Sequence, residues 1–142
     1  MNGIVLDTNV ISEPRRPAPD PRVRAWFEAQ EIERLYLTAT VIAELAAGIE
    51  RMPKGRKRVD FERWLEALVV EDFAGRVLAF DVEAALLYGK LVADALVQGR
   101  PPTVGDAQIA AVARLERMAV ATRDVADFEL MGVPVIDPWQ NG

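Results

Sequence analysis

The sequence predicts an α/β fold: a single-domain, three-layer α/β/α sandwich with a mostly parallel sheet of about five strands. Short apolar runs alternate along the chain with longer stretches in which apolar residues recur at helical spacing. Strands that alternate with helices form parallel sheets covered on both faces, joined by right-handed crossovers. The 142 residues, 51% hydrophobic and 27% charged, suit one globular domain over residues 1–142.

The first half of the chain predicts two strands and three helices. Residues 4–6 form a buried strand, and a proline-rich connection leads to a helix that begins with Asp20 as N-cap and Pro21 at the first helical position. Residues 35–37 form the second strand and residues 41–51 the next helix. After a break at a proline and a glycine, apolar residues at i, i+3, i+4, i+7 and i+8 predict a longer helix through Phe61, Trp64, Leu65, Leu68 and Val69.

The second half predicts three further strands. Residues 77–80 form the third strand, and a helix over residues 82–97 follows it. A glycine- and proline-containing break separates that helix from another over residues 105–117. Residues 119–121 and 133–136 form the last two strands. We therefore expect the carboxyl ends of all strands to lie along one edge of the sheet.

The composition excludes several classes of chemistry. The chain has no cysteine and no histidine, which rules out disulfides, thiolate metal sites, a histidine general base and histidine-ligated zinc. Catalysis must then use oxygen groups. The N-terminal sequence has no basic segment followed by a long apolar core, and no apolar run approaches the roughly 18 residues of a membrane span. We therefore expect a cytoplasmic protein.

The net charge of -5 argues against a protein that coats nucleic acid through many phosphate contacts. Two local basic runs depart from this balance: Arg15, Arg16, Arg22 and Arg24, and then Arg51, Lys54, Arg56, Lys57 and Arg58. Such runs are either solvated surface or sites that steer phosphate groups.

Four acidic residues lie beside predicted strand-to-helix turns: Asp7, Glu44, Asp106 and Asp124. In open α/β folds, ligands bind at the carboxyl ends of the strands, so these side chains would face one another across a small volume. Two unit charges about 4 Å apart repel by roughly 4 kcal/mol at an effective dielectric constant of about 20. A hard divalent cation relieves this repulsion, so we predict a Mg²⁺ or Mn²⁺ site.

Each acid also has a purely structural interpretation, because aspartate after a strand is a routine helix N-cap. Asp7 would cap a helix that begins at the next residue, and Glu44 would be an ordinary surface side chain. Asp106 lies at capping-box spacing after a threonine. Asp124 would cap a short helix with Asp127 as its reciprocal partner, and Asp127 is also a substitute metal ligand. The case for a site rests on the four acids together.

Four sequence blocks resemble the PIN-domain nucleases, and most closely the VapC-type toxins of bacterial toxin–antitoxin pairs. Each block is weak evidence alone, but the four occur in the order and approximate spacing of that family over nearly the whole chain. The blocks are Leu6-Asp7-Thr8-Asn9-Val10-Ile11-Ser12, Thr40-Val41-Ile42-Ala43-Glu44-Leu45 with Gly48, Asp106-Ala107-Gln108-Ile109-Ala110-Ala111, and Ala121-Thr122-Arg123-Asp124 with Asp127-Phe128.

The resemblance implies a PIN-like fold and a divalent-metal-dependent endoribonuclease that uses Mg²⁺ or Mn²⁺. It assigns the metal site to Asp7, Glu44, Asp106 and Asp124, with Asn9 and Thr122 as polar support. We expect Asp7 and Asp106 to be direct ligands, and Glu44 and Asp124 to bind directly or through water. Asn9 and Thr122 would donate hydrogen bonds to water or phosphate.

The expected partners are an RNA substrate and a cognate antitoxin that lays a segment with a basic side chain along the crevice. A homodimer through helical faces between Arg56 and Phe73 is also expected. Alternative functions are a PIN-like domain that binds without cutting, and a receiver-like signalling domain with Asp81 as phosphoacceptor. A dehalogenase-like phosphatase with Asp7 as nucleophile would need aspartate in place of Asn9.

Overall fold

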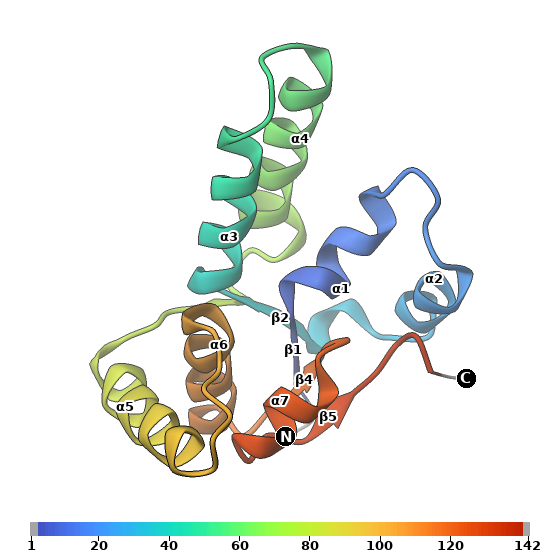
Figure 1. Ribbon diagram of the computed structural model, residues 1–142. Coiled ribbons are helices and arrows are strands. Elements are labelled where there is room, and N and C mark those ends of the chain that lie inside the picture. Colours follow the sequence, from blue (N-terminus) through green and yellow to red (C-terminus); the bar gives the residue numbers. More distant parts are fainter. Residues whose placement is uncertain (1–2, 141–142) are drawn as a thin grey trace.

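The computed structural model describes residues 3–140, and its central element is a five-stranded sheet (Figure 1). The strand order is β3-β2-β1-β4-β5, and all four pairings are parallel. The strands are β1 (Ile4–Leu6), β2 (Leu35–Thr38), β3 (Val77–Leu78), β4 (Ala119–Ala121) and β5 (Val135–Ile136). The predicted parallel α/β class is confirmed, and β1 occupies the centre.

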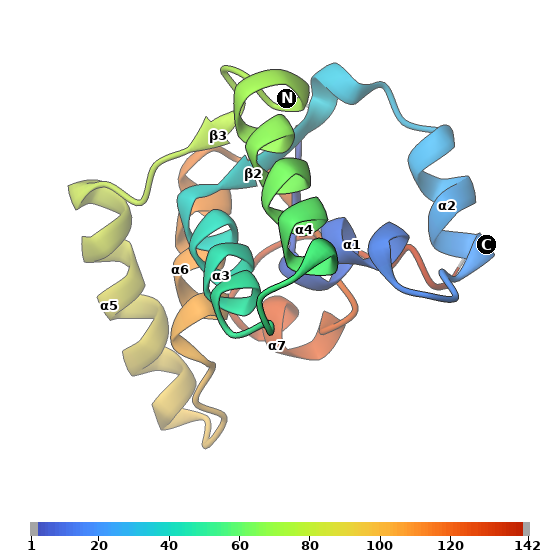
Figure 2. The same cartoon turned by 90° about the horizontal axis from the view of Figure 1, so that it is seen from above.

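Helices lie to both sides of this sheet. In both views, α5 and α6 lie on one side of the strands and α2 lies on the other (Figures 1 and 2). The helices are α1 (Thr8–Ser12), α2 (Pro21–Glu28), α3 (Ala39–Glu50), α4 (Arg56–Ala67), α5 (Val82–Val97), α6 (Val104–Leu115) and α7 (Val125–Leu130). Short turns η1 (Glu13–Arg15) and η2 (Ile32–Arg34) and a π-helical turn η3 (Leu68–Asp72) complete the chain. Within residues 3–140, the helices are too short or too polar to cross a membrane.

The core is formed by the central strands and the helix that packs on them. Val5, Leu6 and Val120 are completely buried, as expected for strands covered on both faces. α6 adds four buried alanines whose small side chains permit close packing: Ala107, Ala110, Ala111 and Ala113. The carboxyl ends of β1 and β4 are thereby fixed next to the start of α6.

Several element ends differ from the sequence prediction. α6 ends at Leu115 instead of residue 117 because Arg117 adopts a left-handed conformation, with φ of 57°. The Met118 N–H then donates to the Ala113 carbonyl at 2.9 Å, which closes the helix end. α3 begins at Ala39, two residues before the predicted start, because the Thr38 hydroxyl accepts the Val41 N–H.

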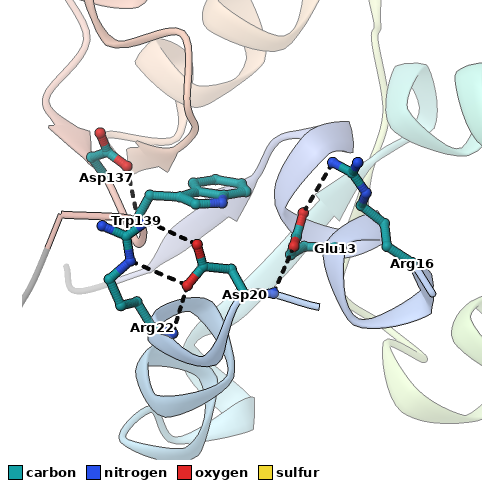
Figure 3. Close-up of polar contacts among 6 residues, drawn as sticks. All are labelled: Glu13, Arg16, Asp20, Arg22, Asp137 and Trp139. Atoms are coloured by element: carbon teal, nitrogen blue, oxygen red, sulfur yellow. Dashed lines mark hydrogen bonds and ion pairs between the residues drawn. The ribbon is translucent and has the colours of Figure 1, made fainter. Parts of the chain in front are cut away.

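The proline-rich connection and the C-terminal segment meet at the start of α2 (Figure 3). The Asp20 side chain accepts the Arg22 N–H at 2.8 Å, so the predicted N-cap is confirmed. The buried Glu13 carboxylate accepts the Asp20 N–H at 2.8 Å. On the C-terminal side, the Trp139 N–H donates to the Asp137 carboxylate at 2.9 Å. These contacts fix the loop that follows α1.

The strand order creates a topological switch point between β1 and β4. From β1 the chain adds β2 and β3 on one side, whereas β4 and β5 lie on the other. The Asp7 N–H donates to the Ala121 carbonyl at 2.9 Å, so the two strands stay paired up to their carboxyl ends. In open parallel sheets, the crevice at this point is the usual ligand site.

Candidate metal centre

Three aspartates meet at the switch point. Asp7 follows β1 directly, Asp124 follows β4 and Asp106 lies in the first turn of α6. One carboxylate oxygen of each lies within 4.8 Å of the others. The fold therefore brings together three of the four acids that the sequence singles out.

Asp7 is the most buried of the three, with 3% of its surface exposed. One carboxylate oxygen accepts the Thr8 N–H at 2.8 Å, and the other accepts the Thr122 hydroxyl at 2.7 Å. Asp7 is thus also the N-cap of α1, so the same side chain caps a helix and belongs to the acidic cluster. The fully buried Thr122 is a positioning residue for Asp7, a role that differs from the expected contact with water or phosphate.

Asp124 is exposed and stays beside Asp7 through two polar neighbours. Its N–H donates to the Thr122 hydroxyl oxygen at 2.9 Å, and the Asn9 amide donates to its carboxylate at 3.3 Å. Asp124 is the N-cap residue of α7, as the structural interpretation expects, but its side chain makes no capping hydrogen bond there. Asp127 forms an ion pair with Arg100 at 3.1 Å and lies outside the three-aspartate group.

Asp106 combines a helix start with a carboxylate that belongs to the site. The Thr103 hydroxyl accepts the Asp106 N–H at 3.1 Å, which confirms the capping pattern seen in the sequence. That bond uses the backbone of Asp106 and leaves the carboxylate oriented toward Asp7 and Asp124. The cap therefore fixes the position from which the side chain enters the site.

Glu44 lies at the rim of the centre and outside the three-aspartate group. The Thr8 hydroxyl donates to its carboxylate at 2.5 Å. Its other oxygen lies against Gly105, where a Cβ atom would be only 2.1 Å away. Thr8 and Gly105 are contacts that the sequence reasoning missed, although each is the sequence neighbour of one of the four acids. Their adjacency to Asp7 and Asp106 was the available signal.

The electrostatics of the metal-free centre favour protonation. Burial raises the pKa of Asp7 to about 6, hydrogen bonds from Thr122 and Thr8 oppose the rise, and the charges of Asp124 and Glu44 add to it. Burial likewise raises the pKa of Asp106 to about 7, reinforced by the charges of Asp7 and Asp124. Carboxylates that repel one another in this way are stabilised by a cation.

The donor set fits a hard divalent ion. All three converging groups are carboxylates, which Mg²⁺ and related ions prefer over nitrogen or sulfur ligands. Opposite ligands of an octahedral Mg²⁺ lie about 4.2 Å apart, so the 4.8 Å limit on the oxygen separations is close to what one ion needs. Asp7 and Asp106 are the buried and half-buried members and would hold the ion.

Replacing Gly105 by alanine tests the placement of Glu44. The new Cβ would meet the Glu44 carboxylate, which is the end of a flexible side chain, so Glu44 should move and the fold should survive. Alanine in place of glycine within α6 should raise the free energy of unfolding by about 0.5 kcal/mol. We therefore expect a lower kcat in the nuclease assay that the sequence resemblance calls for, together with an unchanged or higher Tm measured on the same preparation. Gly89→Ala in α5, where a Cβ has no neighbour within 4 Å, is the matched control. If Gly105→Ala and Gly89→Ala have the same kcat, the position of Glu44 does not matter for activity.

Comparisons with known proteins agree over nearly the whole chain. The model of the PIN domain family matches residues 4–132. The VapC ribonuclease Y4jK of Sinorhizobium fredii is 47% identical over 137 residues, which cover 96% of this chain and 98% of that protein. Toxin FitB of Neisseria gonorrhoeae is 40% identical over 138 residues, covering 97% and 99%. A solved structure of FitAB bound to a DNA fragment superposes with a TM-score of 0.92 at 39% identity, covering 98% of this chain and 97% of that one.

Proposed function

The chain belongs to the PIN domain family, and from this premise we propose that it is a divalent-metal-dependent endoribonuclease and the toxin of a type II toxin–antitoxin system. The observation that carries the proposal is the cluster of Asp7, Asp106 and Asp124 at the switch point of the sheet. The similarity to a VapC ribonuclease and to toxin FitB supports RNA as the substrate and toxicity as the role.

The chemistry is phosphodiester hydrolysis. A bound divalent ion supplies Lewis acidity, orients the reacting groups and offsets charge on the phosphoryl oxygens. Asp7 and Asp106 would hold that ion, and hydrogen bonds from Thr8 and Thr122 fix the Asp7 carboxylate in place. The chain has no histidine, and in this proposal a carboxylate accepts the proton of the attacking water. Glu44 at the rim and the exposed Asp124 are the residues with this freedom.

Cleavage of single-stranded RNA by the purified protein tests the assignment. We expect cleavage with Mg²⁺ or Mn²⁺ and none with EDTA, and single-stranded DNA of the same sequence should be cut more slowly. Single strands are the appropriate probe because sequence-reading proteins mostly contact unpaired bases of RNA. Cleavage that persists in EDTA would point to contamination or to another mechanism.

A toxin of this type requires an antitoxin, which we propose offers a basic side chain to the acidic centre. Co-expression with the product of the adjacent small open reading frame should yield a complex that survives purification and does not cut RNA. In the complex, Asp7→Asn should weaken binding by about tenfold or more because it removes one charge of a partly buried pair. A complex of unchanged affinity would place the partner elsewhere. Absence of any tight partner would count against the toxin role but not against nuclease chemistry.

We also propose a homodimer through the segment between Arg56 and Phe73. Its support is the exposure of apolar side chains there, since Val59, Val69 and Val70 are 40%, 38% and 64% exposed. The mass of the protein in solution, measured by light scattering, tests this proposal. A monomer at micromolar concentration would contradict it.

The receiver-like and the phosphatase alternatives find no support in the geometry. Receiver domains have the strand order 2-1-3-4-5, whereas the order here is 3-2-1-4-5. Asp81 is the N-cap of α5, with its carboxylate bonded to the Ala84 N–H at 3.0 Å. Asn9, at the position where a dehalogenase-like phosphatase needs a second aspartate, instead donates to Asp124.

A further inference from the structure

A groove leads away from the acidic centre between α1 and the α3–α4 pair, which lie together in Figure 2. Its inner part is a hollow of about 300 Å³ that begins at Thr8 and Glu44. Its outer part is a hollow of about 540 Å³ beside η1 and the start of α4. Ser12 and Phe61 line both hollows, so the two hollows adjoin at these side chains.

The outer end of the groove is basic, in contrast to the net charge of -5 of the chain. Arg15, Arg16 and Lys57 line it, and Asp60 is the acid among its lining residues. The Arg15 guanidinium lies 4.7 Å from the centre of the Phe61 ring and forms no ion pair with the residues described, 3–140. Arg16 is partly neutralised by Glu13 at 3.7 Å. The Phe61 and Trp64 rings thus orient the Arg15 guanidinium, whose N–H groups remain available to an anion.

The lining of the inner hollow includes Gly48, in the last turn of α3. Glycine in a helix costs up to about 1 kcal/mol of stability relative to alanine. Packing does not require it, because a Cβ at this position would find no atom within 4 Å. Glycine at this position leaves room for a ligand to approach the α3 backbone closely. The space above Gly48 lies between the acidic centre and the basic end.

We propose that this groove binds the single-stranded RNA that flanks the cleaved phosphodiester. Arg15 and Lys57 contact backbone phosphates, and bases stack on the Arg15 guanidinium, which lies over the Phe61 and Trp64 rings. Gly48 leaves room for the strand. The proposal rests on the proposed function, since it extends the substrate of the same centre. Cations next to aromatic rings beside a metal-type site suit a nucleic-acid strand. The groove would therefore set how strongly the enzyme prefers long RNA over a dinucleotide.

Binding of a labelled single-stranded RNA of ten nucleotides, followed by fluorescence anisotropy in the Asp7→Asn background, tests the groove without cleavage. Gly48→Leu should fill it and lower the affinity about tenfold or more, whereas Ala47→Leu, exposed on the same helix, should not. Arg15→Ala with Lys57→Ala should reduce the slope of log affinity against log salt by about 1.4, or 0.7 for each phosphate contact. Lys90→Ala on α5, which removes one positive charge outside the groove, is the control and should leave the slope unchanged.

Cleavage kinetics separate failure of this proposal from failure of the proposed function. If the groove binds RNA, Gly48→Leu should raise KM for the ten-nucleotide RNA and leave dinucleotide cleavage unchanged, with no fall in Tm. Suppose that the wild type shows metal-dependent cleavage while Gly48→Leu has the same RNA affinity and the same KM as the wild type. That pair of results would overturn the groove proposal and leave the nuclease assignment in place. If the wild type cuts no RNA, the nuclease assignment fails, and the anisotropy result still decides whether the groove binds RNA. If Gly48→Leu weakens binding of the co-expressed antitoxin but leaves the RNA affinity unchanged, the groove binds the protein partner. That result would overturn the proposal.

Discussion

Asp7→Asn should abolish RNA cleavage, with kcat lowered at least about a hundredfold, while the protein stays folded. Loss of contacts that only support a metal ligand already costs roughly 10- to 100-fold in activity, and loss of the ligand itself should cost more. Asparagine has the shape of aspartate and keeps an acceptor for the Thr8 N–H, which holds the side chain at 2.8 Å in the wild type. It also removes one of the repelling charges. The metal-free variant at pH 8 should therefore melt at or above the Tm of the wild type.

Two further substitutions serve as controls for this experiment. Asp124→Asn should also reduce cleavage, because its carboxylate lies in the three-aspartate group. Asp127→Asn should retain activity, since Asp127 pairs with Arg100 at 3.1 Å. Rates and melting curves are measured on the same preparations. An active Asp7→Asn, or an unfolded one, would contradict this account of the centre.

The metal-free protein should lose stability as the pH rises from about 4 to 7. Asp7 and Asp106 have an ordinary pKa of 3.8, and in the folded protein their pKa values are about 6 and about 7. Between these values the folded state binds more protons than the unfolded state, so the free energy of unfolding falls with increasing pH. A pKa raised by about two corresponds to roughly 3 kcal/mol for the buried Asp7.

Added Mn²⁺ or Mg²⁺ should restore this stability at pH 8 and do much less at pH 5, where protons compete for the same oxygens. An ion at 100 times its Kd contributes about 2.7 kcal/mol. The measurement is Tm against pH in EDTA and in metal. Asp60→Asn, an exposed acid away from the centre, should show the wild-type profile, whereas Asp7→Asn should flatten it. A metal-free Tm that rises from pH 5 to pH 8 would mean that folding does not raise the pKa values of Asp7 and Asp106.

The sequence predicted the sheet and the meeting of the aspartates because both follow from short-range rules. Buried strands such as Ile4–Leu6 appear as apolar runs, and polar residues at their carboxyl ends share one edge of a parallel sheet. Asp20 and Thr103 cap helices as their spacing predicts. Helix ends were less predictable, since nothing in the sequence marks Arg117 as the residue that adopts a left-handed conformation.

Contacts between distant segments could not be predicted from local patterns. Glu44 and Gly105 are 61 positions apart in the sequence, and their close approach depends on how α3 packs beside α6. The role of Thr122 follows from its complete burial against Asp7, which its position after a strand does not reveal. The groove beside α1 likewise arises only when the α3–α4 pair is in place.

The most direct test of the metal centre is the anomalous diffraction of crystals soaked in MnCl₂. We expect one strong manganese peak at about 2.1 Å from a carboxylate oxygen of Asp7 and of Asp106, with Asp124 or its water shell completing the coordination. The same soak of Asp7→Asn crystals should lose the peak. A wild-type map at saturating manganese that is empty between these aspartates would contradict the account.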